Sequence, residues 1–254
     1  MTDMELLSGV PLQTLGYAFI GGILPALVWL YFLLKEDSRC PEPVPLLMTA
    51  FLAGMLAVPL ALILEMLFRD LAYVWFAECS PDGRLCTPII LGWSVIEETL
   101  KYALPGLLVL WRKAVNEPID LVIYMLTAAL GFAALENALF LVAPFASGEL
   151  LLGISTGNLR FIGSTLLHVI ASSAIGFALA LSFWLPPFVR AIAAAAGLML
   201  AIALHAVFNF FILQGDGAYT LYAFLIVWIS AVIFFALFEV VRYAWYRNRP
   251  KNVC

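Results

Sequence analysis

Residues 191–215 read AIAAAAGLMLAIALHAVFNFFILQG and contain no Asp, Glu, Lys or Arg. An uncharged apolar run of about 20 residues is long enough to cross the hydrocarbon core of a bilayer as a helix. Similar uncharged runs occupy residues 10–34, 43–64, 161–189 and 217–238. This pattern predicts a protein that crosses the membrane several times.

The composition of the whole chain agrees with that prediction. Of its 254 residues, 64% are hydrophobic and 12% are charged, whereas a soluble domain carries about a quarter charged residues. So few charges cannot cover a water-facing surface. The net charge is −4 and there is no basic block, so no nucleic-acid partner is expected.

Two further stretches of membrane length, 88–111 and 119–145, carry charges in their interiors. Counting them, we expect an all-α polytopic bundle of about seven transmembrane helices that forms a single domain over residues 1–254. The catalytic core is expected at about 88–213, and an outer loop at 69–87. The predicted helices lie near 13–34, 44–68, 88–111, 119–145, 158–185, 189–213 and 218–245.

The positions of Lys and Arg predict the orientation, because cytoplasmic loops carry an excess of these residues. With the N-terminus outside, Arg69 and Arg84 lie outside and Arg160 lies at the start of a helix. Nine basic residues then lie inside: Lys35, Arg39, Arg112, Lys113, Arg190, Arg242, Arg247, Arg249 and Lys251. We therefore expect the N-terminus outside and the C-terminus inside. The first helix is expected to remain as an anchor, because Asp3 and Glu5 stand where a cleavable signal peptide has basic residues.

The cysteines fit this orientation. Cys79 and Cys86 fall in the outer loop, on the side where disulfides persist, whereas Cys40 and Cys254 fall inside. We predict a Cys79–Cys86 disulfide. Two free thiols are the alternative, because sequence alone does not give connectivity.

Four charged residues, Glu97, Glu98, Lys101 and Glu136, lie within apolar stretches. A charge at the centre of a membrane helix costs about 2.5–3.5 kcal/mol, so together they oppose insertion by around 10 kcal/mol. Lys101 is four residues from Glu97 and three from Glu98, so all three share one helix face. A buried ion pair that only holds helices together is the alternative reading. Glu65 lies near a helix end and is expected at the membrane interface.

The chain has two histidines, His168 and His205, and both lie in apolar helices. At 1.5 Å per residue, Glu97, Glu98, Glu136 and both histidines all fall roughly 13–15 Å below the outer boundary. Each histidine alone is more often a hydrogen-bond donor between helices. Their common depth on four helices favours one functional site instead, with Asn209 one turn beyond His205.

Two kinds of chemistry fit this set. Glu136, His168 and His205 would make a zinc site with an open fourth position, and Glu97 or Glu98 would act as general base. Without a metal, a desolvated glutamate would activate water while histidine and asparagine side chains stabilise the oxyanion. Both suit peptide-bond hydrolysis, and both stay open at this point. The sequence contains neither an HExxH nor a GxSxG motif.

The order of these motifs resembles the PrsW-type intramembrane proteases, relatives of the CAAX-processing and bacteriocin-immunity membrane proteases. CAAX relatives have histidine where Glu136 stands, so the PrsW branch fits better. The resemblance covers roughly residues 31–210. The matching residues are Arg39-x-Pro41-Glu42-Pro43, Glu97-Glu98-x-x-Lys101, Gly131-Phe132-Ala133, Phe132-x-x-x-Glu136-Asn137, His168 after Arg160, and His205-x-x-x-Asn209.

The resemblance implies an enzyme of the bacterial inner membrane that cleaves membrane-anchored proteins. Its best-known type of substrate is an anti-sigma factor, cut first in a regulated cascade. In that reading Glu97, Glu98, Lys101 and Asn209 serve catalysis. One alternative is an ion- or proton-coupled transporter that uses the same carboxylates; transporters usually show internal repeats, and none is seen here. A non-catalytic membrane scaffold is the other alternative, and the intact acids and histidines argue against it.

Overall fold

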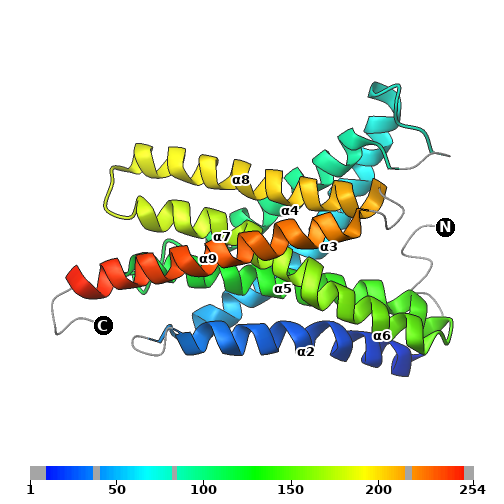
Figure 1. Cartoon of the computed structure of the whole chain (residues 1–254), viewed down its shortest axis with the longest axis horizontal. Helices are drawn as coiled ribbons and strands as arrows, with labels where there is room; N and C mark the ends of the chain where they lie inside the picture. Colours follow the sequence, from blue (N-terminus) through cyan, green and yellow to red (C-terminus); the bar gives the residue numbers. More distant parts are fainter. Residues whose placement is uncertain (1–9, 37–40, 82–84, 215–218, 249–254) are drawn as a thin grey trace.

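The computed structural model describes residues 10–36, 41–81, 85–214 and 219–248, which are helical apart from the segments that join the helices (Figure 1). α6, a short π-helical turn η1 and α7 follow one another without a break, so the described residues form seven helical rods. The predicted all-α class and the number of helices are confirmed. The elements in chain order are α2 (Leu12–Glu36), α3 (Val44–Trp75), α4 (Thr87–Leu108), α5 (Pro118–Ala146), α6 (Leu150–Leu159), η1 (Arg160–Ser164), α7 (Thr165–Leu181), α8 (Pro187–Gln214) and α9 (Thr220–Asn248).

Six of these rods are long and apolar enough to cross a membrane. The other rod is α4, which carries Glu97, Glu98 and Lys101 within 22 residues. All three side chains are buried, so α4 turns its charges into the bundle and away from lipid. The chain is therefore a polytopic integral membrane protein with charged groups in its interior.

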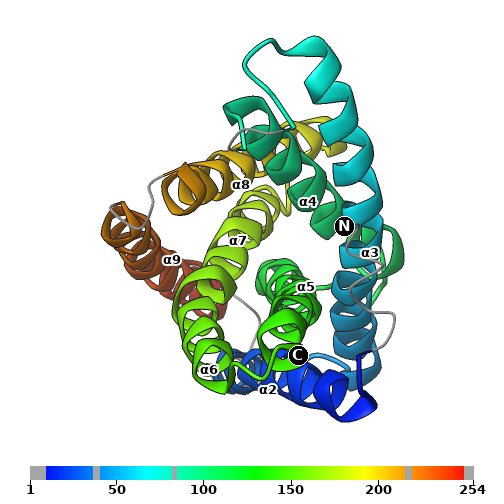
Figure 2. The same ribbon diagram turned by 90° about the vertical axis from the view of Figure 1, so that its right-hand side faces the viewer.

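α5 is the central helix of the bundle (Figure 2). It contacts α2, α3 and α7, and 94% of its most apolar stretch is buried. A Cβ atom on Gly131 would overlap the carbonyl oxygen of Phe51 on α3, and one on Gly54 would overlap that of Ala128 on α5. Such small residues let membrane helices approach closely. The contact fixes the position of α5, and with it the position of Glu136.

α7 and α8 pack against each other equally closely. A Cβ atom on Gly197 of α8 would lie 2.8 Å from the Cβ atom of Ala178 on α7. This pairing brings the two histidines together, because the ring centroids of His168 and His205 are 5.2 Å apart. Residues that are distant in sequence thus meet because their helices cross at small side chains.

α3 and α4 form a hairpin closed by a disulfide. α3 has 32 residues and is about 48 Å long, which exceeds the roughly 30 Å of bilayer hydrocarbon. The disulfide joins Cys79 and Cys86, as predicted. Below it, the indole nitrogen of Trp93 on α4 donates a hydrogen bond to the carbonyl oxygen of Glu65 on α3 (3.4 Å). We call this end of the bundle the disulfide end.

Some predicted boundaries were wrong. The fifth rod begins at Leu150 rather than near residue 158, because α6 and α7 continue through the π-helical turn η1. Arg160 therefore lies within a rod and not at its start. α3 extends to Trp75 rather than 68, because nothing in its sequence stops it before Phe76.

The first and last helices fit the prediction that the two termini lie on opposite sides of the bundle. α2 begins at the disulfide end and α9 finishes at the opposite end (Figure 1). The orientation across a membrane remains a prediction. Several residues used to predict orientation, pairing and resemblance lie outside the described residues: Asp3, Glu5, Arg39, Cys40, Arg84, Arg249, Lys251 and Cys254.

Candidate active site

A cavity of about 540 Å³ lies among α3, α4, α5, α7 and α8. Glu98 and Lys101 lie behind its wall and are fully buried. The convergence predicted from common depth is confirmed, while the chemical roles of these residues stay predictions. The predicted site residues that line the cavity are Glu97, Glu136, His168, His205 and Asn209.

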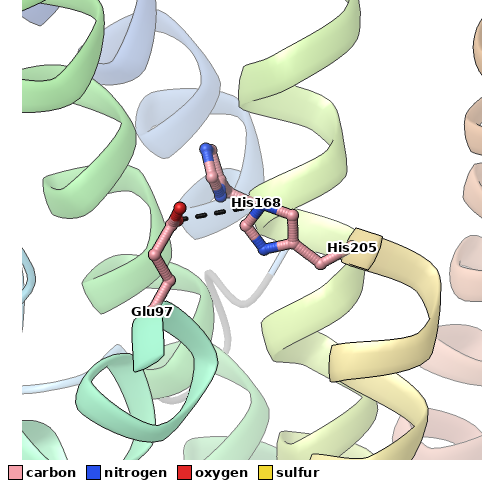
Figure 3. A group of neighbouring side chains, drawn as sticks. All are labelled: Glu97, His168 and His205. Carbon is pink, nitrogen blue, oxygen red and sulfur yellow. Dashed lines mark ion pairs between the residues drawn. The ribbon is translucent and has the colours of Figure 1, made fainter. Parts of the chain in front are cut away.

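Three of the cavity residues form a group that could hold a metal ion. Glu97 on α4, His168 on α7 and His205 on α8 each offer one ligand atom, and these atoms lie within 4.8 Å of one another (Figure 3). All three residues are buried. The carboxylate that joins the two histidines in this group is thus Glu97, and not Glu136 as predicted from the sequence.

His205 is oriented by Glu98. Its Nδ1 lies 2.7 Å from Oε1 of Glu98, and its Nε2 lies 3.8 Å from Oε2 of Glu97. A carboxylate that accepts one ring N–H fixes the tautomer and leaves the other nitrogen available as a ligand. Glu98 and Glu97 are adjacent in sequence, yet one supports the histidine from behind and the other faces the cavity.

Glu98 is held by three donors. Lys101 Nζ lies 2.5 Å from its Oε1, and the Ser172 hydroxyl donates to its Oε2 at 3.3 Å. With His205 these contacts satisfy a carboxylate that has no exposed surface. Both carboxylate oxygens of Glu98 therefore already accept hydrogen bonds from other side chains. Of the two adjacent glutamates, Glu97 is the one whose carboxylate faces the cavity.

Both ring nitrogens of His168 are engaged. Nδ1 lies 2.9 Å from Lys101 Nζ, and Nε2 lies 3.0 Å from Oε2 of Glu136. Because an ammonium group only donates, Nδ1 accepts from Lys101, and Nε2 then carries the proton that is donated to Glu136. His168 would have to give up one of these contacts in order to bind a metal.

Arg160 is a site residue whose role was not predicted from the sequence. Its guanidinium pairs with Oε2 of Glu136, donates from Nε to the Asn137 side-chain oxygen at 2.6 Å, and stacks on Phe140 at 3.8 Å from the ring centroid. It belongs to the π-helical turn, and such turns are frequent at functional sites. The four-residue spacing from Arg160 through Ser164 to His168 was the signal available in sequence.

Glu65 is the second residue whose place differs from the expectation. It was expected at the membrane interface, but it lines the same cavity as Glu97 and Glu136. The expectation assumed that the helix ends near residue 68, whereas α3 continues for ten residues beyond Glu65, to Trp75.

The residues present fit a zinc-type ion in donor chemistry, burial and charge. Zinc binds histidine nitrogen and carboxylate oxygen at about 2.0–2.2 Å, which places ligand atoms roughly 3–4 Å apart. The group needs only a small inward movement to reach that spacing. Around it, the carboxylates of Glu97, Glu98 and Glu136 outnumber the cationic side chains of Lys101 and Arg160, and excess negative charge favours a cation.

Fold and site together define a polytopic helical membrane protein with a buried two-histidine, one-carboxylate centre beside a cavity. The chain belongs to the PrsW family. The family model, described as "PrsW family intramembrane metalloprotease", matches residues 42–238.

Two curated relatives extend this comparison. "Protease PrsW" of Geobacillus kaustophilus (strain HTA426) is 29% identical over 160 residues, which cover 61% of this chain and 62% of that protein. "Protease PrsW" of Clostridioides difficile (strain 630) is 26% identical over 168 residues, or 63% of each chain. The matches thus span less than two thirds of the relatives' length. No solved structure matches the chain.

Proposed function

We propose that this protein is an intramembrane endopeptidase that hydrolyses peptide bonds of membrane-anchored proteins, with a divalent metal such as zinc as cofactor. The observation that carries the proposal is the buried group of Glu97, His168 and His205 beside a cavity of about 540 Å³. Membership of a family described as metalloproteases supports it. Its catalytic core would run from about residue 88 to 213, with α3 and α9 completing the cavity.

In this proposal Glu97, His168 and His205 hold the ion. When bound, the ion supplies Lewis-acid polarisation of the scissile carbonyl group. Glu98 keeps the Nε2 atom of His205 directed at the site, and Lys101 balances the charge of Glu98.

Glu136 is then the carboxylate left to accept a proton from water. Its contacts with Arg160 and His168 both use Oε2, and no described residue bonds to Oε1. A general base must reach its proton by a short hydrogen bond, and Oε1 belongs to a side chain that lines the cavity. Arg160 holds this carboxylate in place. Asn209, also in the cavity wall, would donate its amide hydrogens to the developing oxyanion.

The substrate and the location follow from the same proposal. A substrate with a transmembrane segment can present its backbone to a cavity that lies among membrane helices. An anti-sigma factor of the bacterial inner membrane is the substrate type that the family resemblance implies. The rival function, ion- or proton-coupled transport, would use the same buried carboxylates.

The test is cleavage of a model single-pass membrane protein by the full chain reconstituted in liposomes. Mass spectrometry would identify the cut, and metal content would be measured in the same preparations. We expect cleavage by the wild type, loss of cleavage and of metal in His205→Ala, and no change in Glu239→Gln. The last is a matched control, since Glu239 is exposed and pairs with Arg242 at 2.7 Å, away from the cavity.

Three outcomes would count against the proposal. Full cleavage after exhaustive chelation, with no bound metal, would contradict the metal mechanism. Full cleavage by His205→Ala would remove the site from the reaction. Proton flux through the wild type, lost in His205→Ala and accompanied by no cleavage, would favour the transporter.

A further inference from the structure

A second cavity, of about 400 Å³, lies at the end of the bundle opposite the disulfide. Charge asymmetry in the sequence predicts that this end faces the cytoplasm. The cavity shares no lining residue with the active-site cavity. The residues that line it are Tyr102, Gly106, Leu110, Trp111, Arg112, Val115, Leu121, Leu179, Phe183 and Arg190.

Two arginines from separate segments line this cavity, and none of its described lining residues is acidic. Arg112 follows the end of α4, and Arg190 lies in the first turn of α8. Neither makes an ion pair with any described residue. Arg112 uses only its Nε, which donates to the carbonyl oxygen of Leu108 at 3.2 Å. The terminal amino groups of both arginines are thus left for an external acceptor.

Both guanidinium groups are held against aromatic rings. Arg112 stacks on Trp111 at 4.3 Å from the ring centroid, and Arg190 lies over Phe183 at 5.7 Å. Stacking restrains a long side chain, so less conformational freedom is lost when an anion binds. Guanidinium groups match the geometry of phosphate oxygens, which they bind through two parallel hydrogen bonds.

Most of the other lining side chains are apolar, among them Leu110, Leu121 and Leu179. Trp111 and the nearby Trp184 are 64% and 71% exposed, as expected for tryptophans at a membrane–water interface. A ligand that fits must therefore combine an anionic phosphate with a hydrocarbon portion. Basic pockets between helices on the cytoplasmic side are the places where anionic lipid headgroups bind.

We propose that the cavity between α4, α7 and α8 binds the phosphate group of an anionic glycerophospholipid, held by Arg112 and Arg190, with its acyl chains along the apolar wall. The site is separate from the active site and does not depend on protease activity. A free phosphate ion shares the headgroup chemistry but makes no use of the apolar wall.

The test measures the first bound lipid by native mass spectrometry of the full chain. The detergent-solubilised protein is titrated with phosphatidylglycerol or with phosphatidylcholine. We expect the wild type to prefer phosphatidylglycerol. In Arg112→Gln/Arg190→Gln the affinity for phosphatidylglycerol should fall roughly 25-fold, since each basic residue near a membrane surface contributes about fivefold. Affinity for phosphatidylcholine should not change.

A matched control is Lys113→Gln/Arg242→Gln, which removes two positive charges at the same end but outside the cavity wall. It should retain phosphatidylglycerol binding within about threefold. The single variants, each expected to lose about fivefold, replace the double variant if its melting temperature shows that it does not fold. Arg112→Lys/Arg190→Lys should bind phosphatidylglycerol with intermediate affinity, because lysine keeps the positive charge but lacks the planar guanidinium group.

Several results would overturn the lipid site. These are equal binding of the two lipids by the wild type, wild-type binding by both the double and the single glutamine variants, or an equal loss in the control. Inorganic phosphate is the final arm. If it protects the wild type from heat and displaces the lipid, while the glutamine variants lose both effects equally, the cavity is a phosphate-ion site and not a lipid site.

Discussion

The Nδ1 atom of His205 lies 2.7 Å from Oε1 of Glu98, although 107 positions separate the two residues. Because of this contact, two adjacent glutamates have different surroundings. Glu98 is buried behind the cavity wall and supports the histidine, whereas Glu97 faces the cavity with both histidines. The first predictions follow from this difference.

Glu97→Gln and Glu136→Gln should have different effects on metal binding. If Glu97 is a ligand, its replacement loses metal and cleavage together. If Glu136 is the general base, its replacement retains the metal and lowers the cleavage rate by about 10²–10⁴. Metal content and single-turnover cleavage of the reconstituted variants would be compared with Glu239→Gln. The opposite result, with metal lost only in Glu136→Gln, would restore the roles assigned from sequence.

Lys101→Met should destabilise the bundle. The ammonium group is fully buried between Glu98 at 2.5 Å and Glu97 at 3.5 Å, and removing one partner of a buried ion pair costs about 3–5 kcal/mol. Unfolding in mixed micelles would be followed for this variant and for Lys113→Met, whose side chain is exposed. Adding Glu98→Gln to Lys101→Met should recover part of the loss. Unchanged stability of Lys101→Met would mean that Glu98 carries no charge in the folded protein.

Arg160→Lys should impair cleavage although the charge is kept. The guanidinium bonds at once to Glu136, Asn137 and Ser164, and a single ammonium group cannot reproduce that fork. Loss of a residue that orients a site residue typically lowers activity by about 10–100-fold. Arg69→Lys is the control, since Arg69 lines the cavity and, among the described residues, pairs only with the exposed Asp70. Equal activity of both variants would leave Arg160 without a positioning role.

Labelling of intact cells should decide the orientation. An impermeant maleimide should not react with Cys79 or Cys86 until their disulfide is reduced, and both should then react from outside. Cys40 and Cys254, predicted to lie inside, should react only after the cells are opened. External labelling of Cys254 in intact cells would reverse the predicted orientation.

Sequence by itself determined the membrane class, the number of helices and the convergence of the polar residues. Those features depend on local quantities, namely the length of uncharged runs and the 1.5 Å rise per residue. The disulfide was also predictable, since its cysteines are seven residues apart in one loop. The order of the motifs was sufficient to find the family resemblance.

Only the tertiary structure decided which polar side chains contact one another and which of them face the cavity. Helical spacing puts Glu97, Glu98 and Lys101 on one face, but it does not say which carboxylate meets His205 and which meets the cavity. Nor could it place Arg160 beside Glu136, because that contact joins two different rods and Arg160 lies in a π-helical turn that the sequence did not predict. Glu65 lines the cavity where α3 packs against α4, next to the hydrogen bond from Trp93 to the Glu65 carbonyl oxygen. The physical reason is common to all three cases. The depth of a residue depends on its position along its own helix. Contact between two residues depends on how their helices are rotated and how they cross. Small residues such as Gly54 and Gly131 control that crossing, because they let the helices approach closely.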